Sequence, residues 1–299
     1  ERDLDGDGVL NIFDSTPYPP TTNPPNPLPQ RNVAGFQEGS IYTNSTLSSG
    51  GYHTCAILDD GSVSCWGSNL LGQLGEGTTL DRTTPTQTSS LGTGRTAVAI
   101  TSGDHHTCAI LDDGSVSCWG YNNEGQLGDG TSINRVTPTP TSSLGTGRTA
   151  VSISAGYDHT CAILDDGSVS CWGRNYKGQL GDGTAIDRTT PTQTSSLGTG
   201  RTAVAISSGY YYTCAILDNG SVSCWGYNNE GQLGDGTSIN RGTPTPTSSL
   251  GTGRTAVSIT AGYEHTCAIL DDGSVSCWGY NDKGQLGDGT AIDRTTPTQ

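Results

Sequence analysis

Apolar residues in this chain occur in short runs separated by glycine, serine, threonine and aspartate. In one representative stretch, residues 97–100 read Ala-Val-Ala-Ile, residues 107–111 read Thr-Cys-Ala-Ile-Leu and residues 115–119 read Ser-Val-Ser-Cys-Trp. Runs this short, bounded by turn formers, predict β-strands rather than helices. Between the last two runs, Asp112-Asp113-Gly114 predicts a three-residue hairpin loop in which the glycine takes the left-handed conformation.

The whole pattern recurs through the chain. The string Cys-Ala-Ile-Leu-Asp-Asp-Gly-Ser-Val-Ser-Cys-Trp-Gly returns every 53 residues, with Asn in place of the second Asp in one copy. A Gly-Gln-Leu-Gly-Asp/Glu-Gly stretch and a Pro-Thr segment follow each copy, and we expect the latter to form an edge strand because proline cannot donate to a ladder. The five units lie near 44–96, 97–149, 150–202, 203–255 and 256–299. Four short strands per unit of this length suit a propeller blade.

The consensus of the units is G-x-x-H-T-C-A-I-L-x-D-G-S-V-x-C-W-G-x-N-x-x-G-Q-L-G-D-G-T. It resembles the RCC1 (regulator of chromosome condensation) repeat and covers residues 44–299. The resemblance implies an all-β fold, a β-propeller of four-stranded blades, usually seven to a ring; five units are visible here.

Ten cysteines form five pairs at the same two positions of each unit. Counting outward from a loop at Asp59-Asp60-Gly61 places Cys55 opposite Cys65, close enough to bond across one hairpin. Zinc binding and buried free thiols are the alternatives. The expected disulfides are Cys55–Cys65, Cys108–Cys118, Cys161–Cys171, Cys214–Cys224 and Cys267–Cys277.

Disulfides imply an oxidising compartment, so we expect an extracellular or cell-surface location. Asn44 and Asn219 each begin an N-glycosylation sequon, which is compatible with that location.

The N-terminal segment, residues 1–14, carries oxygen ligands at the spacing of a calcium loop, with Gly8 at the sharp turn. It resembles thrombospondin type 3 repeats and, less closely, a dockerin loop. We expect structural Ca²⁺ here, with a merely acidic turn as the alternative. The ligand set is Asp3, Asp5, Asp7, the backbone carbonyl of Val9, Asn11 and Asp14.

Residues 15–43 predict a proline-rich linker and lead-in to the propeller at 44–299, because seven prolines between residues 15 and 30 keep that stretch extended. The chain begins inside the calcium motif, so we expect a processed or truncated piece of a longer protein. It has no apolar run long enough to span a membrane.

The formal net charge of −15, with only 14 basic residues, argues against binding to nucleic acid or to anionic lipid. No Ser-His-Asp order, HExxH motif or P-loop is present, so we expect no catalytic residue and no enzyme activity. Four histidines, His53, His106, His159 and His265, share one position that Tyr212 takes in unit 4, and we expect hydrogen bonds from them to backbone. Trp66 and its four copies are expected in the blade core.

Two stretches vary between otherwise near-identical units. The first reads Gly51-Tyr52, Asp104-His105, Tyr157-Asp158, Tyr210-Tyr211 and Tyr263-Glu264; the second begins at Ser68, Tyr121, Arg174, Tyr227 and Tyr280. Tyrosine beside polar residues on loops is typical of recognition surfaces, and neutral drift is the alternative. The candidate binding residues are Tyr52, His105, Tyr157, Tyr210, Tyr211, Tyr263, Tyr121, Tyr176, Tyr227 and Tyr280.

These observations favour an extracellular binding or scaffold module that recognises a protein or a glycan through the propeller loops. The alternative is a structural cell-surface or filament component that self-associates through its end strands and takes no small ligand. The family resemblance also implies guanine-nucleotide exchange or secreted enzyme inhibition; the acidic charge and paired cysteines disfavour exchange.

Overall fold

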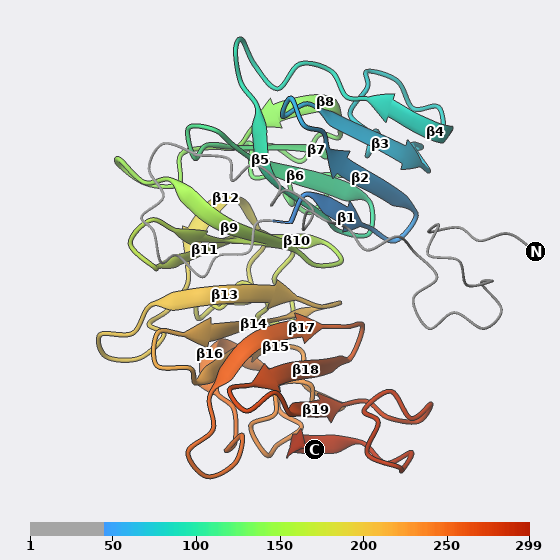
Figure 1. Ribbon diagram of the computed structural model, residues 1–299. Coiled ribbons are helices and arrows are strands. Elements are labelled where there is room, and N and C mark those ends of the chain that lie inside the picture. Colours follow the sequence, from blue (N-terminus) through green and yellow to red (C-terminus); the bar gives the residue numbers. More distant parts are fainter. Residues whose placement is uncertain (1–44) are drawn as a thin grey trace, which may run out of the picture. The chain divides into compact units, whose positions relative to one another are not determined.

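The computed structural model describes residues 45–299, so the expected calcium loop and linker lie outside the described residues. The described chain folds into five four-stranded antiparallel sheets, one per repeat unit, with the strands of each sheet in sequence order (Figure 1). The expected β-propeller blades are confirmed. The expected edge position of the Pro-Thr segment is also confirmed, because it forms the last strand of every sheet.

The strand bounds repeat closely from unit to unit. They are β1 (Leu47–Ser49), β2 (His53–Ile57), β3 (Val63–Gly67) and β4 (Arg82–Gln87) in unit 1; β5 (Ala97–Ser102), β6 (His106–Leu111), β7 (Val116–Gly120) and β8 (Arg135–Pro140) in unit 2; β9 (Ala150–Ala155), β10 (His159–Leu164), β11 (Val169–Gly173) and β12 (Arg188–Gln193) in unit 3; β13 (Ala203–Ser208), β14 (Tyr212–Leu217), β15 (Val222–Gly226) and β16 (Arg241–Pro246) in unit 4; and β17 (Ala256–Ala261), β18 (His265–Leu270), β19 (Val275–Gly279) and β20 (Arg294–Thr298) in unit 5.

The central hairpin of each blade has the register that the sequence predicts. In unit 2, Cys108 pairs with Cys118, and the Leu111 N–H donates to the Ser115 carbonyl at 2.8 Å. Gly114 has φ 77°, and a Cβ there would lie 2.5 Å from the Thr149 side chain, so glycine is required for both conformation and space. All five expected disulfides are formed, and the described residues contain no free cysteine.

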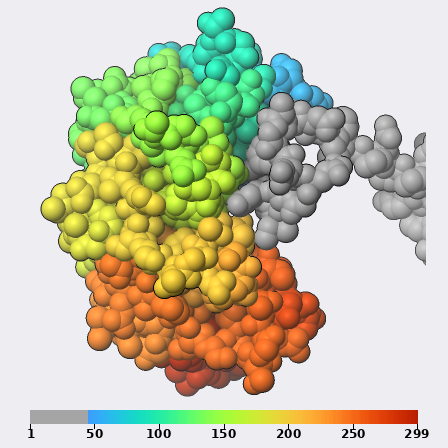
Figure 2. All heavy atoms as spheres, turned by 90° about the vertical axis from the view of Figure 1, so that its left-hand side faces the viewer, coloured from blue at the N-terminus to red at the C-terminus, as the bar shows by residue number. Residues whose placement is uncertain are grey.

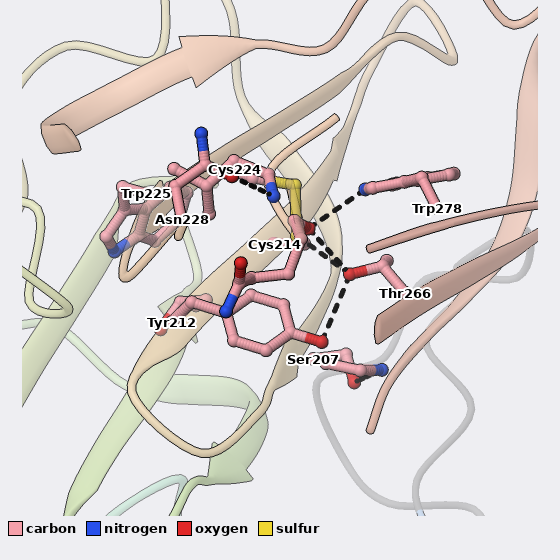
Figure 3. Close-up of a disulfide and its surroundings, with 12 residues drawn as sticks. Ser207, Tyr212, Cys214, Cys224, Trp225, Asn228, Thr266 and Trp278 are labelled. Atoms are coloured by element: carbon pink, nitrogen blue, oxygen red, sulfur yellow. Dashed lines mark hydrogen bonds between the residues drawn. A yellow bond between two sulfur atoms is a disulfide. The ribbon is translucent and has the colours of Figure 1, made fainter. Parts of the chain in front are cut away.

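Consecutive units pack face to face, as the successive coloured bands of Figure 2 show. Between units 4 and 5, Ile216, Val222 and Leu233 of one blade pack against Leu270 and Trp278 of the next in one apolar cluster. The Trp278 indole N–H donates to the carbonyl of Gln232 at 2.9 Å (Figure 3). The tryptophans of units 2 to 5 are fully buried, which confirms their core role, whereas Trp66 of unit 1 is only partly buried.

The repeated histidines make a different contact from the one expected. His53 Nε2 lies 2.8 Å from the Thr107 hydroxyl of the next blade, and His106 and His159 make the same contact at 2.9 Å. Backbone is therefore the wrong partner, because strand β2 and its copies point this side chain across the boundary between blades. Tyr212 fills the position equivalently, accepting from the Thr266 hydroxyl at 3.1 Å (Figure 3).

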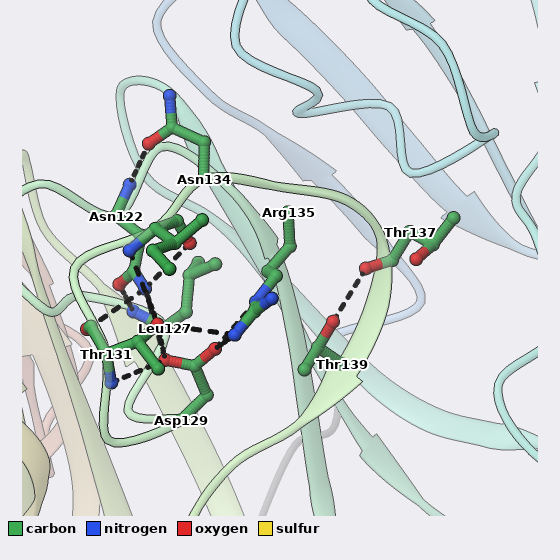
Figure 4. A network of polar contacts seen from close by, with 9 residues as sticks. Asn122, Leu127, Asp129, Thr131, Asn134, Arg135, Thr137 and Thr139 are labelled. Atoms are coloured by element: carbon green, nitrogen blue, oxygen red, sulfur yellow. Dashed lines mark hydrogen bonds and ion pairs between the residues drawn. The ribbon is translucent and has the colours of Figure 1, made fainter.

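The Gly-Gln-Leu-Gly-Asp/Glu-Gly motif stabilises the long loop between the third and fourth strands. In unit 2 the buried Asn122 amide donates to Asp129 at 3.1 Å and to two loop carbonyls, and its oxygen accepts from the Leu127 N–H (Figure 4). Arg135 in turn donates to Asp129 at 2.7 Å. This recurring motif is therefore structural, since it satisfies a buried loop backbone.

In unit 4 one face of the sheet is covered by unit 5. The equivalent face of unit 5 is exposed. Ile269 and Val275 are 45% and 50% exposed, whereas Ile216 and Val222, at the same positions of unit 4, are 2% and 1% exposed. From the first cysteine to the tryptophan the two hairpins differ only at Asn219 and Asp272 and have the same register, so the difference in burial comes from the blade that covers unit 4.

This pair of sites gives a matched test of packing between blades. We expect Ile216→Ala to lower the free energy of unfolding by about 2–5 kcal/mol and Ile269→Ala to lower it by less than half as much, because the second site leaves a smaller cavity. Urea unfolding of the two variants measures both values. Equal losses would mean that blade contacts contribute little beyond the hairpin itself.

Candidate binding site

The strand order places the two variable stretches at the same end of each blade. In unit 2 the turn between β5 and β6 (residues 103–105) and the loop between β7 and β8 (residues 121–134) lie at one end, and the hairpin loop at 112–115 lies at the other. The candidate residues therefore share one surface, which we call the variable end.

A shallow, open cavity of about 300 Å³ lies at the variable end, and we call it the mouth. Each unit contributes the first residue of its first variable stretch to the lining. These five residues are Gly51, Asp104, Tyr157, Tyr210 and Tyr263, and the remaining lining consists of glycine, serine and alanine. Three of the candidate tyrosines thus converge from three different blades.

The mouth tyrosines contact one another directly. The Tyr157 and Tyr210 ring centroids lie 4.4 Å apart edge to face, and those of Tyr210 and Tyr263 lie 3.9 Å apart and stacked. Tyr263 is 59% exposed, while Tyr211 behind the row is nearly buried. A Cβ at Gly209 would lie 2.2 Å from Tyr212, so only glycine lets the turn that carries Tyr210 approach this closely.

A second group surrounds Tyr211. The Arg174 guanidinium lies 4.5 Å from the Tyr176 ring centroid and 5.5 Å from that of Tyr211, and it forms an ion pair with Asp158 at 3.1 Å. The Gln126 amide also donates to Asp158, at 3.2 Å. Burial raises the pKa of Asp158 to about 6, against the lowering effect of Arg174.

Tyr52 of unit 1 and His105 of unit 2 form a third group. Their rings stack at 5.4 Å, and His105 Nε2 lies 3.0 Å from an Asp104 carboxylate oxygen. His105 thereby connects this pair to the mouth through Asp104.

The remaining candidates, Tyr121, Tyr227 and Tyr280, lie on the outer loops of the variable end. Burial first, and then Glu264 and Glu230, raise the pKa of Tyr227. A hydrogen bond with Asp282 is the main reason that the pKa of Tyr280 rises to about 12. Carboxylates thus lie near Tyr227 and Tyr280, and the Lys177 Nζ also lies 5.3 Å from the Tyr227 ring centroid.

Asp104, Asp158 and Arg174 also belong to the site, although the sequence did not single them out. All three stand within the variable stretches beside candidate tyrosines, which is the pattern that could have identified them. Their pairing with residues of other loops is not readable from the spacing.

The predicted calcium and glycosylation sites lie away from the mouth or outside the described residues. The calcium ligands Asp3 to Asp14, and Asn44, lie outside the described residues, so these stay predictions. Asn219 is exposed in a hairpin loop, where its side-chain oxygen accepts from the Ser221 N–H at 3.1 Å. Residues 45–299 hold neither a group of three or more His, Cys, Asp or Glu placed to bind a metal ion nor a helix long and apolar enough to cross a membrane.

A further cavity, of about 480 Å³, is lined mainly by the first strands of the blades, including Ile153, Val204, Ile206 and Ile259. Apart from Asp218 its lining is uncharged, and it contains none of the candidate residues.

The architecture is thus that of a β-propeller in which each blade carries one hairpin disulfide, with a tyrosine-lined cavity at one end. Residues 19–299 match the RCC1-like domain family, and the chain belongs to that family. It is 30% identical to the Ultraviolet-B receptor UVR8 of Arabidopsis thaliana over 271 residues, covering 91% of this chain and 59% of the receptor. It is 29% identical to the human E3 ubiquitin-protein ligase HERC2 over 274 residues, covering 91% of this chain and 6% of the ligase.

Solved structures show the same fold. Human WBSCR16 superposes with a TM-score of 0.74 at 22% identity, over 84% of this chain and 65% of that one. Yeast RCC1 (Prp20), in its complex with Kap60, superposes with a TM-score of 0.55 at 19% identity, over 84% of this chain and 73% of that one.

Proposed function

We propose that this chain is a protein-binding module that holds its partner at the mouth and works outside the cytosol. One observation carries the proposal: where the five units differ, Tyr157, Tyr210 and Tyr263 converge from three blades into one cavity. The fold brings this position of every unit to the mouth, and the observation that favours binding over drift is that three of the five units place tyrosine there.

The chemistry of the mouth supports a protein partner. Tyrosine supplies a large contact area at a low cost in side-chain entropy, and hydroxyls that exchange hydrogen bonds with a ligand backbone. The rigid strands beneath hold these loops in place, as in other scaffolds that carry recognition on loops. Among proteins of this fold, yeast Prp20 is described in complex with Kap60 and with binding properties to Gsp1p and histones.

The location rests on the cysteines. Five disulfides, with the eight sulfur-bearing residues of units 1 to 4 fully buried, suit an oxidising compartment, because cytosolic thiols are kept reduced. An extracellular or cell-surface setting fits this requirement.

The test is a selection of binders from a displayed library of small protein domains on the native chain. Each enriched domain is then measured against the variant Tyr157→Ala/Tyr210→Ala/Tyr263→Ala. We expect dominant clones to lose at least 100-fold in affinity for the variant, since buried aromatic anchors carry most of an interface's energy.

The matched control is Leu80→Ala/Ile133→Ala/Ile186→Ala, three exposed apolar residues on the long loops, which should change affinity less than threefold. Both variants must unfold at the temperature of the native chain. Clones that bind the tyrosine variant as tightly as the native chain would refute the mouth as the binding site.

A further inference from the structure

We propose that the mouth takes a cationic side chain, a lysine or arginine that the protein partner presents; this inference rests on the proposed function. The partner is therefore a protein with a basic residue at the centre of its contact surface. Three features of the mouth lead to this assignment.

The first feature is the carboxylate that shares the ring of mouth positions with the tyrosines. Asp104 occupies in unit 2 the position that Tyr157, Tyr210 and Tyr263 occupy in units 3 to 5, and all four side chains line the same cavity. In unit 1 this position is Gly51, where a Cβ would lie 1.9 Å from an Asp104 oxygen, so the glycine leaves room for the carboxylate. One carboxylate thus lines the same cavity as three phenol rings, and its other contact is with His105 Nε2 at 3.0 Å.

The second feature is the aromatic surface itself. A cation within about 6 Å of a tyrosine ring centroid is attracted by the ring quadrupole, and more strongly where water is excluded. The chain already makes this contact beside the mouth, where Arg174 lies 4.5 Å from the Tyr176 ring centroid.

The third feature is the sign of the surrounding charge. Burial and the nearby carboxylates Asp104 and Asp158 raise the pKa of Tyr157 to about 12. Burial, Glu230 and Asp293 raise the pKa of Glu264, so further negative charge accumulates beside Tyr263. The Arg174 guanidinium is paired with Asp158, so these two charges offset each other, and Asp104 is the charged residue that lines the mouth itself.

The experiment uses two fluorescent hexapeptides. In one, glycine alternates with arginine; in the other, glycine alternates with citrulline, the neutral isostere of arginine. Fluorescence anisotropy against the native chain should give at least 10-fold tighter binding of the arginine peptide. Asp104→Asn and Tyr210→Leu should each weaken that binding about 5- to 10-fold, while Tyr210→Phe, which keeps the ring face, should stay within twofold.

Asp112→Asn is the control for general acidity, because this partly exposed carboxylate lies on a hairpin loop at the opposite end of the blade. It should change binding less than twofold. Equal binding of the two peptides, or equal effects of Asp112→Asn and Asp104→Asn, would overturn the inference.

The two proposals fail in different ways. If selected domains lose affinity for the triple tyrosine variant while the arginine and citrulline peptides bind alike, the mouth is a binding site and the cationic assignment is wrong. If selected domains bind the tyrosine variant normally, the proposed function itself is wrong.

Discussion

Reduction of the five disulfides will lower the free energy of unfolding by an amount on the order of 10 kcal/mol. Each disulfide joins cysteines separated by 10 positions in the sequence. In the chain-entropy account, such a closure contributes about 2–3 kcal/mol by restricting the unfolded chain. The sum is comparable to the whole stability of an ordinary domain, so we expect the reduced chain to be largely unfolded at 37 °C.

Urea unfolding followed by tryptophan fluorescence, with and without reductant, measures the effect, since four tryptophans are buried between blades. The variant Cys161→Ser/Cys171→Ser removes one disulfide and should lose about 2–3 kcal/mol, somewhat more if the serines are left without hydrogen-bond partners. An unchanged urea midpoint for a chain with ten titratable thiols would contradict this account.

Acidification from pH 7 to pH 5 will also lower stability, by several kcal/mol. Burial and, to a smaller extent, His105 lower the pKa of His53 to about 4. Burial and, to a smaller extent, the neighbouring histidines lower the pKa of His106 to about 3. Burial alone lowers the pKa of His159 to about 3. Between these values and 6.5 the unfolded chain binds protons that the native chain does not, so stability falls as the pH falls.

Each of these histidines costs about 1.4 kcal/mol per pH unit below 6.5, or roughly 6 kcal/mol for the three at pH 5. Asp158 acts in the opposite direction: its raised pKa of about 6 restores about 1 kcal/mol over the same interval. Burial raises the pKa values of Asp129 and its copies, but side-chain hydrogen bonds lower them further, so the net shift is downward. These carboxylates therefore change the stability only below about pH 4.

Unit 4 provides the matched variant for this prediction. Tyr212 replaces histidine there and keeps the contact with the next blade's threonine, so His159→Tyr should fold and should lower the pH dependence by about one third. Urea titrations at pH 7 and pH 5 measure it. A pH dependence that is unchanged in His159→Tyr would show that other groups bind the protons.

Contacts within one hairpin are predictable from the sequence. The alternation of strand residues and the length of the hairpin loop place Cys108 opposite Cys118 without knowledge of the rest of the fold. The edge position of the Pro-Thr strand follows equally from the chemistry of proline.

Contacts that a side chain makes with the next unit are not predictable in this way. The partner of His53 is Thr107, which stands 54 positions further along the chain and is reached only because the blades stack. The same holds for the mouth: the spacing identifies Tyr157 and Tyr210 as variable, but their convergence depends on how successive blades turn about a common centre. The predicted propeller implies a common centre, but the spacing of the repeats does not give the ring contacts, such as the stacking of Tyr210 on Tyr263 at 3.9 Å.

The central claim is that the mouth is the recognition site. Hydrogen–deuterium exchange tests it most directly, measured on the native chain with and without a selected protein binder. The account predicts slower exchange on binding at residues 155–158, 208–211 and 261–264, with no change at the hairpin loops 165–168 and 218–221. Protection confined to the hairpin loops or to the outer strands, with the mouth unchanged, would contradict it.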